Sequence, residues 1–296
     1  MPQHMDTAMT RIRTRKLATV MILMTAACAA ASAASPVQDY IAARDGYLKQ
    51  FKDSTVGGDD SVTKAHDKAL LDLGTRLRPI IGPLQIAGFP ESKVNLESLA
   101  EGDEGYGLLD GLVYSSSDQK SQVVVTTDEL FSQWLAAHKR WWDGKDDIPA
   151  GTEAALKSES FYTQALNTDA HFFAFGDIPL AKPAGATFIY ATLIGRGQDV
   201  GLQIPDEIVV TLRSGGRLFV ATIPTDVKIG AAPTCAQNWA KAEKRAQSTN
   251  VDKGEAIRET GYDTYRRCFA AQAPHQSYFT AVVRQAQGLI DVLSQK

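Results

Sequence analysis

The chain has 296 residues, of which 44% are hydrophobic and 22% charged, and its formal net charge at pH 7 is −3. This composition is typical of a folded globular protein and argues against an intrinsically disordered chain. Its lysines and arginines form no stripe interleaved with aromatic residues, so a nucleic-acid partner is not expected.

The first 33 residues have the pattern of a secretory signal peptide. A basic cluster from Arg11 to Lys16 precedes an apolar run that begins at Leu17, and the small-x-small site ends at Ala33. Cleavage there would remove four of the 31 basic residues and one of the 34 acids. The mature chain would keep 27 basic and 33 acidic residues, a net charge of −6.

Two alternatives to cleavage after Ala33 rank below it. An uncleaved membrane anchor needs about 18 apolar residues, and the second half of this run is mostly alanine. A lipoprotein attached through Cys28 would ordinarily carry Leu, Val or Ile three residues earlier, where Thr25 stands. No second long apolar run follows, so we expect no membrane span after cleavage and a periplasmic or secreted protein.

Two cysteines remain in the mature chain, Cys235 and Cys268. An even number of cysteines in an exported chain predicts a disulfide bond. A redox role is not expected, because the sequence has no C-x-x-C motif.

In chain order, the apolar spacing first predicts two helices, over 37–51 and over 61–80, the second ended by Pro79. A glycine- and proline-rich irregular stretch covers 80–106. Residues 107–130 predict a β-hairpin that runs into a helix, with Thr126 and Glu129 as its capping box. That helix carries Phe131 and Trp134 on its apolar face.

The second half predicts strands and then helices. The strands are expected over 169–178, 186–194, 207–212 and 217–223, with a tight turn at 214–216. Helices are expected around Trp239, over 257–269 and over 277–293. This order predicts an α+β fold, an antiparallel sheet packed against N-terminal and C-terminal helices. Residues 34–296 are taken as one mature domain, with a subdivision near residue 150 left open.

Familiar site motifs are rejected on their context. The glycine-rich stretch 195–201 is followed by a proline and a strand, whereas a nucleotide loop precedes a helix. The acidic loops 101–104 and 143–147 lack the spacing of calcium-binding loops. We find no signature of a serine hydrolase or zinc protease, and no cofactor is expected.

The stretch TDAHFFAFGDIPL, residues 168–180, raises a catalytic hypothesis. In a regular strand, Asp169, His171, Phe173, Phe175 and Asp177 share one face. Asp169 and His171 could orient a water or bind a metal together with a third ligand. The simpler interpretation, which we prefer, is a strand with polar residues at one end and the phenylalanines in the core.

Trp141 and Trp142 form a second candidate site. They stand near the end of a predicted helix, where paired tryptophans can anchor a partner protein or stack on sugars. The alternative is that Trp142 closes the core. We rank partner binding here above the catalytic hypothesis.

These features favour an exported binding or interaction module of the cell envelope, whose ligand the sequence does not identify. A hydrolytic or metal-assisted enzyme that uses Asp169 and His171 is the first alternative. A structural envelope-assembly protein is the second.

Overall fold

The computed structural model describes residues 35–51, 60–95, 109–141, 152–158, 161–162, 165, 171–197, 205–226 and 233–295. All of them belong to one unit of the chain, residues 34–296. The predicted signal peptide lies outside the described residues.

Seven strands form one antiparallel sheet with the order β1-β2-β3-β7-β6-β5-β4. Their bounds are β1 Glu91–Asn95, β2 Gly111–Ser115, β3 Gln122–Thr127, β4 His171–Asp177, β5 Ala186–Gly197, β6 Glu207–Ser214 and β7 Arg217–Pro224. The turn between β6 and β7 holds Gly215 at φ 60° and Gly216 at φ 76°. Two consecutive positive φ angles fit a type I′ turn, whose twist matches the flanking strands. The predicted tight turn is therefore confirmed.

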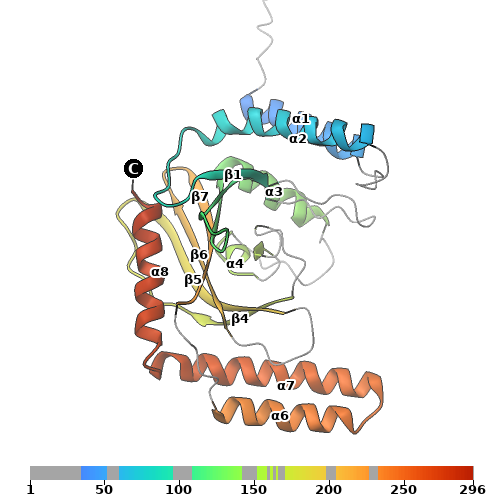
Figure 1. Ribbon diagram of the computed structural model, residues 1–296, viewed down its shortest axis with the longest axis vertical. Coiled ribbons are helices and arrows are strands. Elements are labelled where there is room, and N and C mark those ends of the chain that lie inside the picture. The colour runs from blue at the N-terminus through green and yellow to red at the C-terminus, as the bar shows by residue number, and fades with distance from the viewer. Residues whose placement is uncertain are drawn as a thin grey trace, which may run out of the picture. The chain divides into compact units, whose positions relative to one another are not determined.

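Helices lie before, between and after the strands, and the predicted α+β class is confirmed (Figure 1). The described helices are α1 Pro36–Phe51, α2 Asp60–Ile81, α3 Asp128–Trp141, α4 Thr152–Leu156, α6 Pro233–Gln247, α7 Val251–Gln272, a 3-10 turn Ala273–His275 and α8 Phe279–Leu293. Along the part of the chain that is described, no helix is both long and apolar enough to cross a membrane.

Each face of the sheet carries its own apolar cluster, because side chains alternate along each strand. Val123 and Val125 of β3 pack on the face covered by α1, α2, α6, α7 and α8. Val124 points to the opposite face and packs with Phe131 and Trp134 of α3 and with Leu156 of α4. The sheet is thus buried on both sides.

Several predicted helix boundaries need correction; α7, for example, runs over Val251–Gln272 and not over 257–269. Pro79 does not end α2, which continues to Ile81. The helix ends there because Gly82, at φ 76°, donates its N–H to the carbonyl of Arg78 (2.9 Å), which is the left-handed helix cap that glycine favours. The N-cap of α3 is Thr127 rather than Thr126: the Leu130 N–H donates to Thr127 Oγ1 (3.3 Å).

Strand β4 contains a bulge that breaks the regular alternation expected for TDAHFFAFGDIPL. Ala174 pairs with Ile194 and Gly176 with Leu193, so one extra residue, Phe175, lies between the pairs. Phe175 is buried against α7, whereas exposed Asp177 accepts a hydrogen bond from Tyr190 Oη (2.9 Å). The sequence had suggested that Asp177 and Phe175 share one face of the strand. Because of the bulge, they do not.

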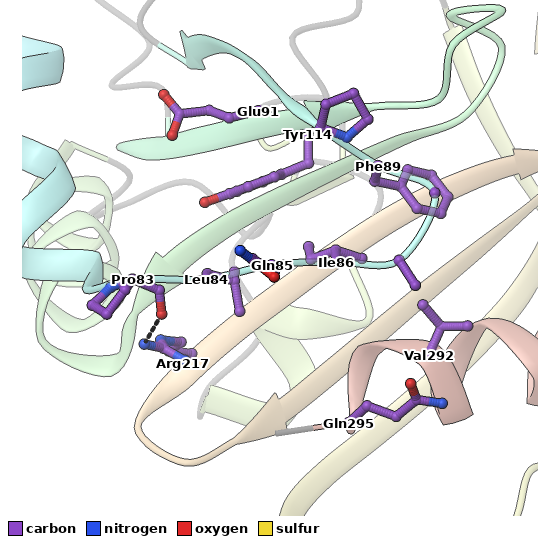
Figure 2. Close-up of a pocket in the computed structure, with 13 residues that line it drawn as sticks. Pro83, Leu84, Gln85, Ile86, Phe89, Glu91, Tyr114, Arg217, Val292 and Gln295 are labelled. Atoms are coloured by element: carbon purple, nitrogen blue, oxygen red, sulfur yellow. Dashed lines mark hydrogen bonds between the residues drawn. The ribbon is translucent and has the colours of Figure 1, made fainter.

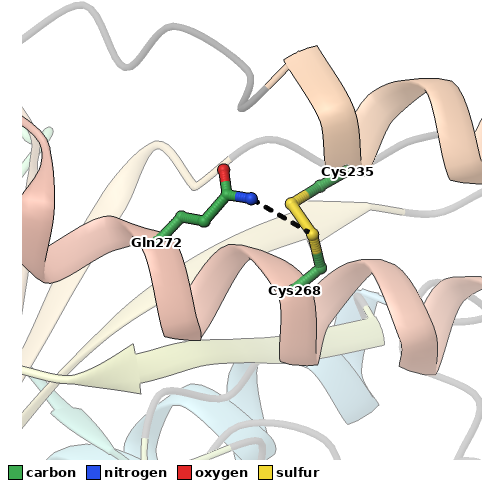
Figure 3. The surroundings of a disulfide bond; sticks show 3 residues. All are labelled: Cys235, Cys268 and Gln272. Atoms are coloured by element: carbon green, nitrogen blue, oxygen red, sulfur yellow. Dashed lines mark hydrogen bonds between the residues drawn. A yellow bond between two sulfur atoms is a disulfide. The ribbon is translucent and has the colours of Figure 1, made fainter.

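The predicted disulfide is present between Cys235 in α6 and Cys268 in α7, with their Cα atoms 5.7 Å apart (Figure 3). Gln272, one turn further along α7, directs its side-chain amide toward Cys268 Sγ at 3.7 Å. The two helices also approach closely along their length. A Cβ added at Gly261 would lie 2.5 Å from the Cβ of Ala242.

Candidate functional site

The side chains of the residues predicted as sites are not described. His171 begins β4 and pairs with Gly197 of β5, and Asp169 lies outside the described residues. Trp141 is the last residue of α3, and Trp142 also lies outside the described residues. A search of the described residues finds no group of three or more His, Cys, Asp or Glu side chains that could hold a metal ion.

A pocket of about 730 Å³ lies beside the segment Gly82–Pro90, which connects α2 to β1 (Figure 2). The rest of its wall comes from Glu91 of β1, Tyr114 of β2, Arg217 of β7, and Val292 and Gln295 at the end of α8. Its volume is within the usual range for small-molecule sites. Sequence reasoning had assigned this segment only to the irregular stretch 80–106.

A tight turn shapes the rim of the pocket. The Phe89 N–H donates to the Ile86 carbonyl (2.9 Å), and Gly88 at φ 81° occupies the third position of the turn. A positive φ at that position is the requirement of a type II turn, and glycine meets it without strain. The turn leaves Ile86 buried and Phe89 half-buried, both lining the pocket.

Arg217 is held in place by the backbone at the end of α2. Its Nε donates to the Ile81 carbonyl (2.9 Å), and its Nη2 donates to the Pro83 carbonyl (3.3 Å). The first bond satisfies a carbonyl that the end of α2 would otherwise leave free. The two bonds use two of the five guanidinium N–H donors. Within the described residues, Arg217 has no carboxylate partner.

Tyr114 brings a hydroxyl to the same pocket. The residue is 4% exposed, and burial, followed by the nearby Glu91 carboxylate, raises its pKa, while Arg217 and Arg78 lower it. The hydroxyl therefore stays protonated at neutral pH and can donate a hydrogen bond. None of the described residues forms a hydrogen bond with it.

Glu91 is paired with Arg78 of α2, whose Nε lies 2.8 Å from Glu91 Oε1. Both residues line a second pocket of about 410 Å³, together with Leu112. Glu91, Tyr114 and the chain from Pro83 to Gln85 line both pockets, so the two pockets adjoin along the segment Gly82–Pro90 (the strap).

The main pocket has chemically distinct ends. In Figure 2 the Tyr114 hydroxyl points to the end where Pro83 and Arg217 lie. Ile86, Phe89 and Val292 gather at the other end. This arrangement suits a molecule with one polar and one apolar end.

A buried ion pair elsewhere in the protein was also missed from the sequence. Arg44 Nη1 of α1 lies 2.6 Å from Asp110 Oδ2, and Asp110, directly before β2, is 3% exposed. Burial raises the pKa of Asp110 to about 6, although Arg44 lowers it. The buried Tyr40 lies beside this carboxylate, which contributes to raising the pKa of the Tyr40 hydroxyl. The pair lines neither pocket and holds α1 against the sheet.

A groove of about 540 Å³ runs along the α6–α7 helix pair. Lys241 and Arg245 of α6 face Thr260 and Thr264 of α7 across it. Both hydroxyls already donate to carbonyls of their own helix, at 2.9 Å each. The described residues that line the groove include two cations and no carboxylate.

The sequence carried weak signals for these features. Asp110 interrupts the apolar run GLLDGLV, and an acid in such a run predicts a buried and paired carboxylate. Leu84, Ile86 and Phe89 are apolar residues in a glycine- and proline-rich connection, which is where a binding loop is expected.

Comparisons with models of known protein families, with curated proteins and with solved structures found no match to this chain.

Proposed function

We propose that the protein is an exported binding module of the cell envelope, periplasmic or secreted, and that its ligand occupies the pocket beside Gly82–Pro90. The observation that carries the proposal is the pocket itself. A hollow of about 730 Å³ with aliphatic and aromatic walls and a few convergent polar groups is the usual form of a small-molecule site.

The residues that shape the pocket are fixed by the fold. The type II turn sets its rim, and Arg217 ties the strap to β7 through two backbone carbonyls. A site that is formed before the ligand arrives binds with a smaller entropic cost.

Export is supported by the signal-peptide pattern and by the Cys235–Cys268 disulfide, which persists in an oxidising compartment. The alternatives of a metal-assisted enzyme at Asp169 and His171, and of a structural assembly protein, stay predictions. Partner binding at Trp141 and Trp142 also stays a prediction.

The test uses the neutral fluorescent probe N-phenyl-1-naphthylamine, which brightens when it enters an apolar site. We expect the purified mature protein to bind one equivalent. Ala87→Trp should abolish this binding, because Ala87 is exposed on the turn and lines the pocket, where an indole would fill the space.

Val251→Trp is the matched control, because it places the same side chain at a position that is 81% exposed and lines none of the three pockets. It should bind the probe like the wild type. Absence of probe binding to the folded wild-type protein, or equal binding to Ala87→Trp, would remove the pocket as the ligand site.

A further inference from the structure

We propose that the pocket beside Gly82–Pro90 selects small organic anions with an apolar body, such as carboxylic acids with an aliphatic or aromatic tail. This inference rests on the proposed function, because it names the ligand class of the same site. Its basis is a fixed cation and a free hydroxyl at one end of the pocket and an apolar wall at the other.

The cation is Arg217, and it is oriented before any ligand binds. Two neutral carbonyls, those of Ile81 and Pro83, hold its Nε and Nη2. Neutral acceptors leave the positive charge in place, and three N–H donors remain available. A guanidinium whose position is already fixed loses little side-chain entropy when it binds an anion.

The hydroxyl of Tyr114 supplies the second donor. Burial and Glu91 keep it protonated, so it donates to an anion and does not repel it. Figure 2 shows the hydroxyl directed to the Arg217 end of the pocket. An oxyanion there would receive a charge-assisted hydrogen bond from each residue.

Glu91 is the one carboxylate among the described residues that line the pocket, and its charge opposes an anion. Arg78 pairs with it at 2.8 Å and offsets that charge. The net charge of Glu91, Arg78 and Arg217 is therefore positive. This balance favours an anion over a cation, and Glu91 limits how tightly the anion binds.

The apolar body would lie against Leu84, Ile86, Phe89 and Val292. The first three come from the strap and the fourth comes from α8, so the ligand would lie between the two. Burial of such a body contributes roughly 25 cal/mol per Å² of apolar surface removed from water.

The experiment compares two probes that share one ring system. N-phenyl-1-naphthylamine is neutral, and 8-anilino-1-naphthalenesulfonate carries one additional sulfonate. The ratio of their dissociation constants is the anion preference of each protein variant. Comparing this ratio between variants cancels the difference in the probes' own hydrophobicity.

Arg217→Met should lower the anion preference by about tenfold or more, the scale of a lost charge-assisted hydrogen bond. Tyr114→Phe should lower it by about three- to tenfold. Glu91→Gln should raise it severalfold, because the opposing charge is gone.

Retained binding of the neutral probe shows that the pocket of each variant is intact. If Arg217→Met also loses the neutral probe, the variant has lost its fold at the strap, and Tyr114→Phe then decides the question. Equal anion preference in the wild type and Tyr114→Phe, with the neutral probe bound to both, would overturn the inference and leave the proposed function standing.

The double variant Lys241→Met/Arg245→Met is the control for anion binding at the cationic groove of α6–α7. It should keep the anion preference of the wild type. Loss of the preference in this variant, and not in Arg217→Met, would place the anion in the groove and overturn the inference.

Discussion

The two helix pairs of the protein are held in place by different interactions, one by an ion pair and the other by a disulfide bond. The pair α1–α2 packs on β1, β2 and β3, and its first helix is held by the buried ion pair of Arg44 with Asp110, directly before β2. The pair α6–α7 packs on β4 at the other edge, and its helices are joined by the Cys235–Cys268 disulfide. Figure 1 shows the pairs at opposite ends of the sheet.

This difference means that pH acts on one pair and reducing agents act on the other. A buried carboxylate responds to protons, whereas a disulfide responds to thiols. The α6–α7 pair also has a short connection and a close contact at Gly261, and its two helices contact each other more than they contact the sheet. The α1 helix, by contrast, depends on a residue 66 positions away.

The largest expected effect comes from Arg44→Met. It leaves Asp110 buried without its cation, and loss of one partner of a buried pair costs about 3–5 kcal/mol. Urea denaturation at pH 7.5 measures this loss. Arg76→Met is the control, because it breaks an exposed pair with Asp72 and should change stability by less than about 0.5 kcal/mol. If Arg44→Met and Arg76→Met lower the free energy of unfolding equally, the burial of Asp110 does not determine the cost of losing its partner.

Removal of the disulfide should have the next largest effect. The bond spans 33 residues, and closing a loop of that length contributes about 3–4 kcal/mol in the chain-entropy account. Cys235→Ala/Cys268→Ala should lose that amount in urea denaturation, equally at pH 5 and pH 7.5. The wild type in dithiothreitol should match the double variant. If the loss of stability differs strongly between pH 5 and pH 7.5, the stability of the α6–α7 pair also depends on pH, which contradicts the contrast drawn between the two helix pairs.

The pH dependence of the first pair follows from Asp110. Its pKa in the folded protein is about 6, above the ordinary 3.8, because burial outweighs Arg44. The folded state therefore binds the proton more tightly, and the stability from this group is greatest below pH 4 and is lost as pH rises through 6. The stability of the wild type relative to Asp110→Asn should be higher at pH 4 than at pH 7.5 by about 2.5 kcal/mol.

Urea denaturation of both proteins at the two pH values measures this difference. The opposite slope, with the wild type gaining stability toward pH 7.5, would show that Arg44 outweighs burial and that the pKa of Asp110 is lowered.

The smallest effect is expected at the turn between α6 and α7. Asn250 Oδ1 accepts from the Lys253 N–H (3.0 Å) and caps α7. Asn250→Ala should cost about 1 kcal/mol, and Asn250→Asp should recover it, because aspartate caps equally well. Thermal unfolding of the three proteins gives the comparison. Failure of aspartate to recover the loss would mean that the side chain acts in another way.

The sequence predicted the disulfide and the strands β2 to β7 because their signals are local, whereas β1 (Glu91–Asn95) lies within the stretch predicted to be irregular. The strands β5, β6 and β7 are apolar runs separated by turn residues, and their predicted starts agree with the structure. The predicted mature chain has two cysteines, which leave one intramolecular pairing. The predicted N-cap of α3 was wrong by one residue. Thr126 and Thr127 have the same side chain, and only the path of the backbone decides which of them caps the helix.

The pocket and the buried pair could not be predicted in the same way. Tyr114, Arg217 and Val292 meet only after three distant segments have folded together. Asp110 stands out in its apolar run, yet nothing local names Arg44 as its partner. The bulge at Phe175 has one local sign, Gly176, but a glycine within a strand can equally mark a sharp bend or the close approach of another backbone.

The pairing of β3 with β7 has a consequence for the order in which the chain folds. Thr127 lies opposite Arg217, ninety positions later, and Gln122 lies opposite Thr222, so this seam joins two parts of the sheet that otherwise form from neighbouring strands. Long-range pairing of this kind is slow, because the loop must close before the contacts form. Until β7 pairs with it, the edge of β3 is open to other chains, so the β1–β3 segment is exposed to aggregation before the sheet is complete.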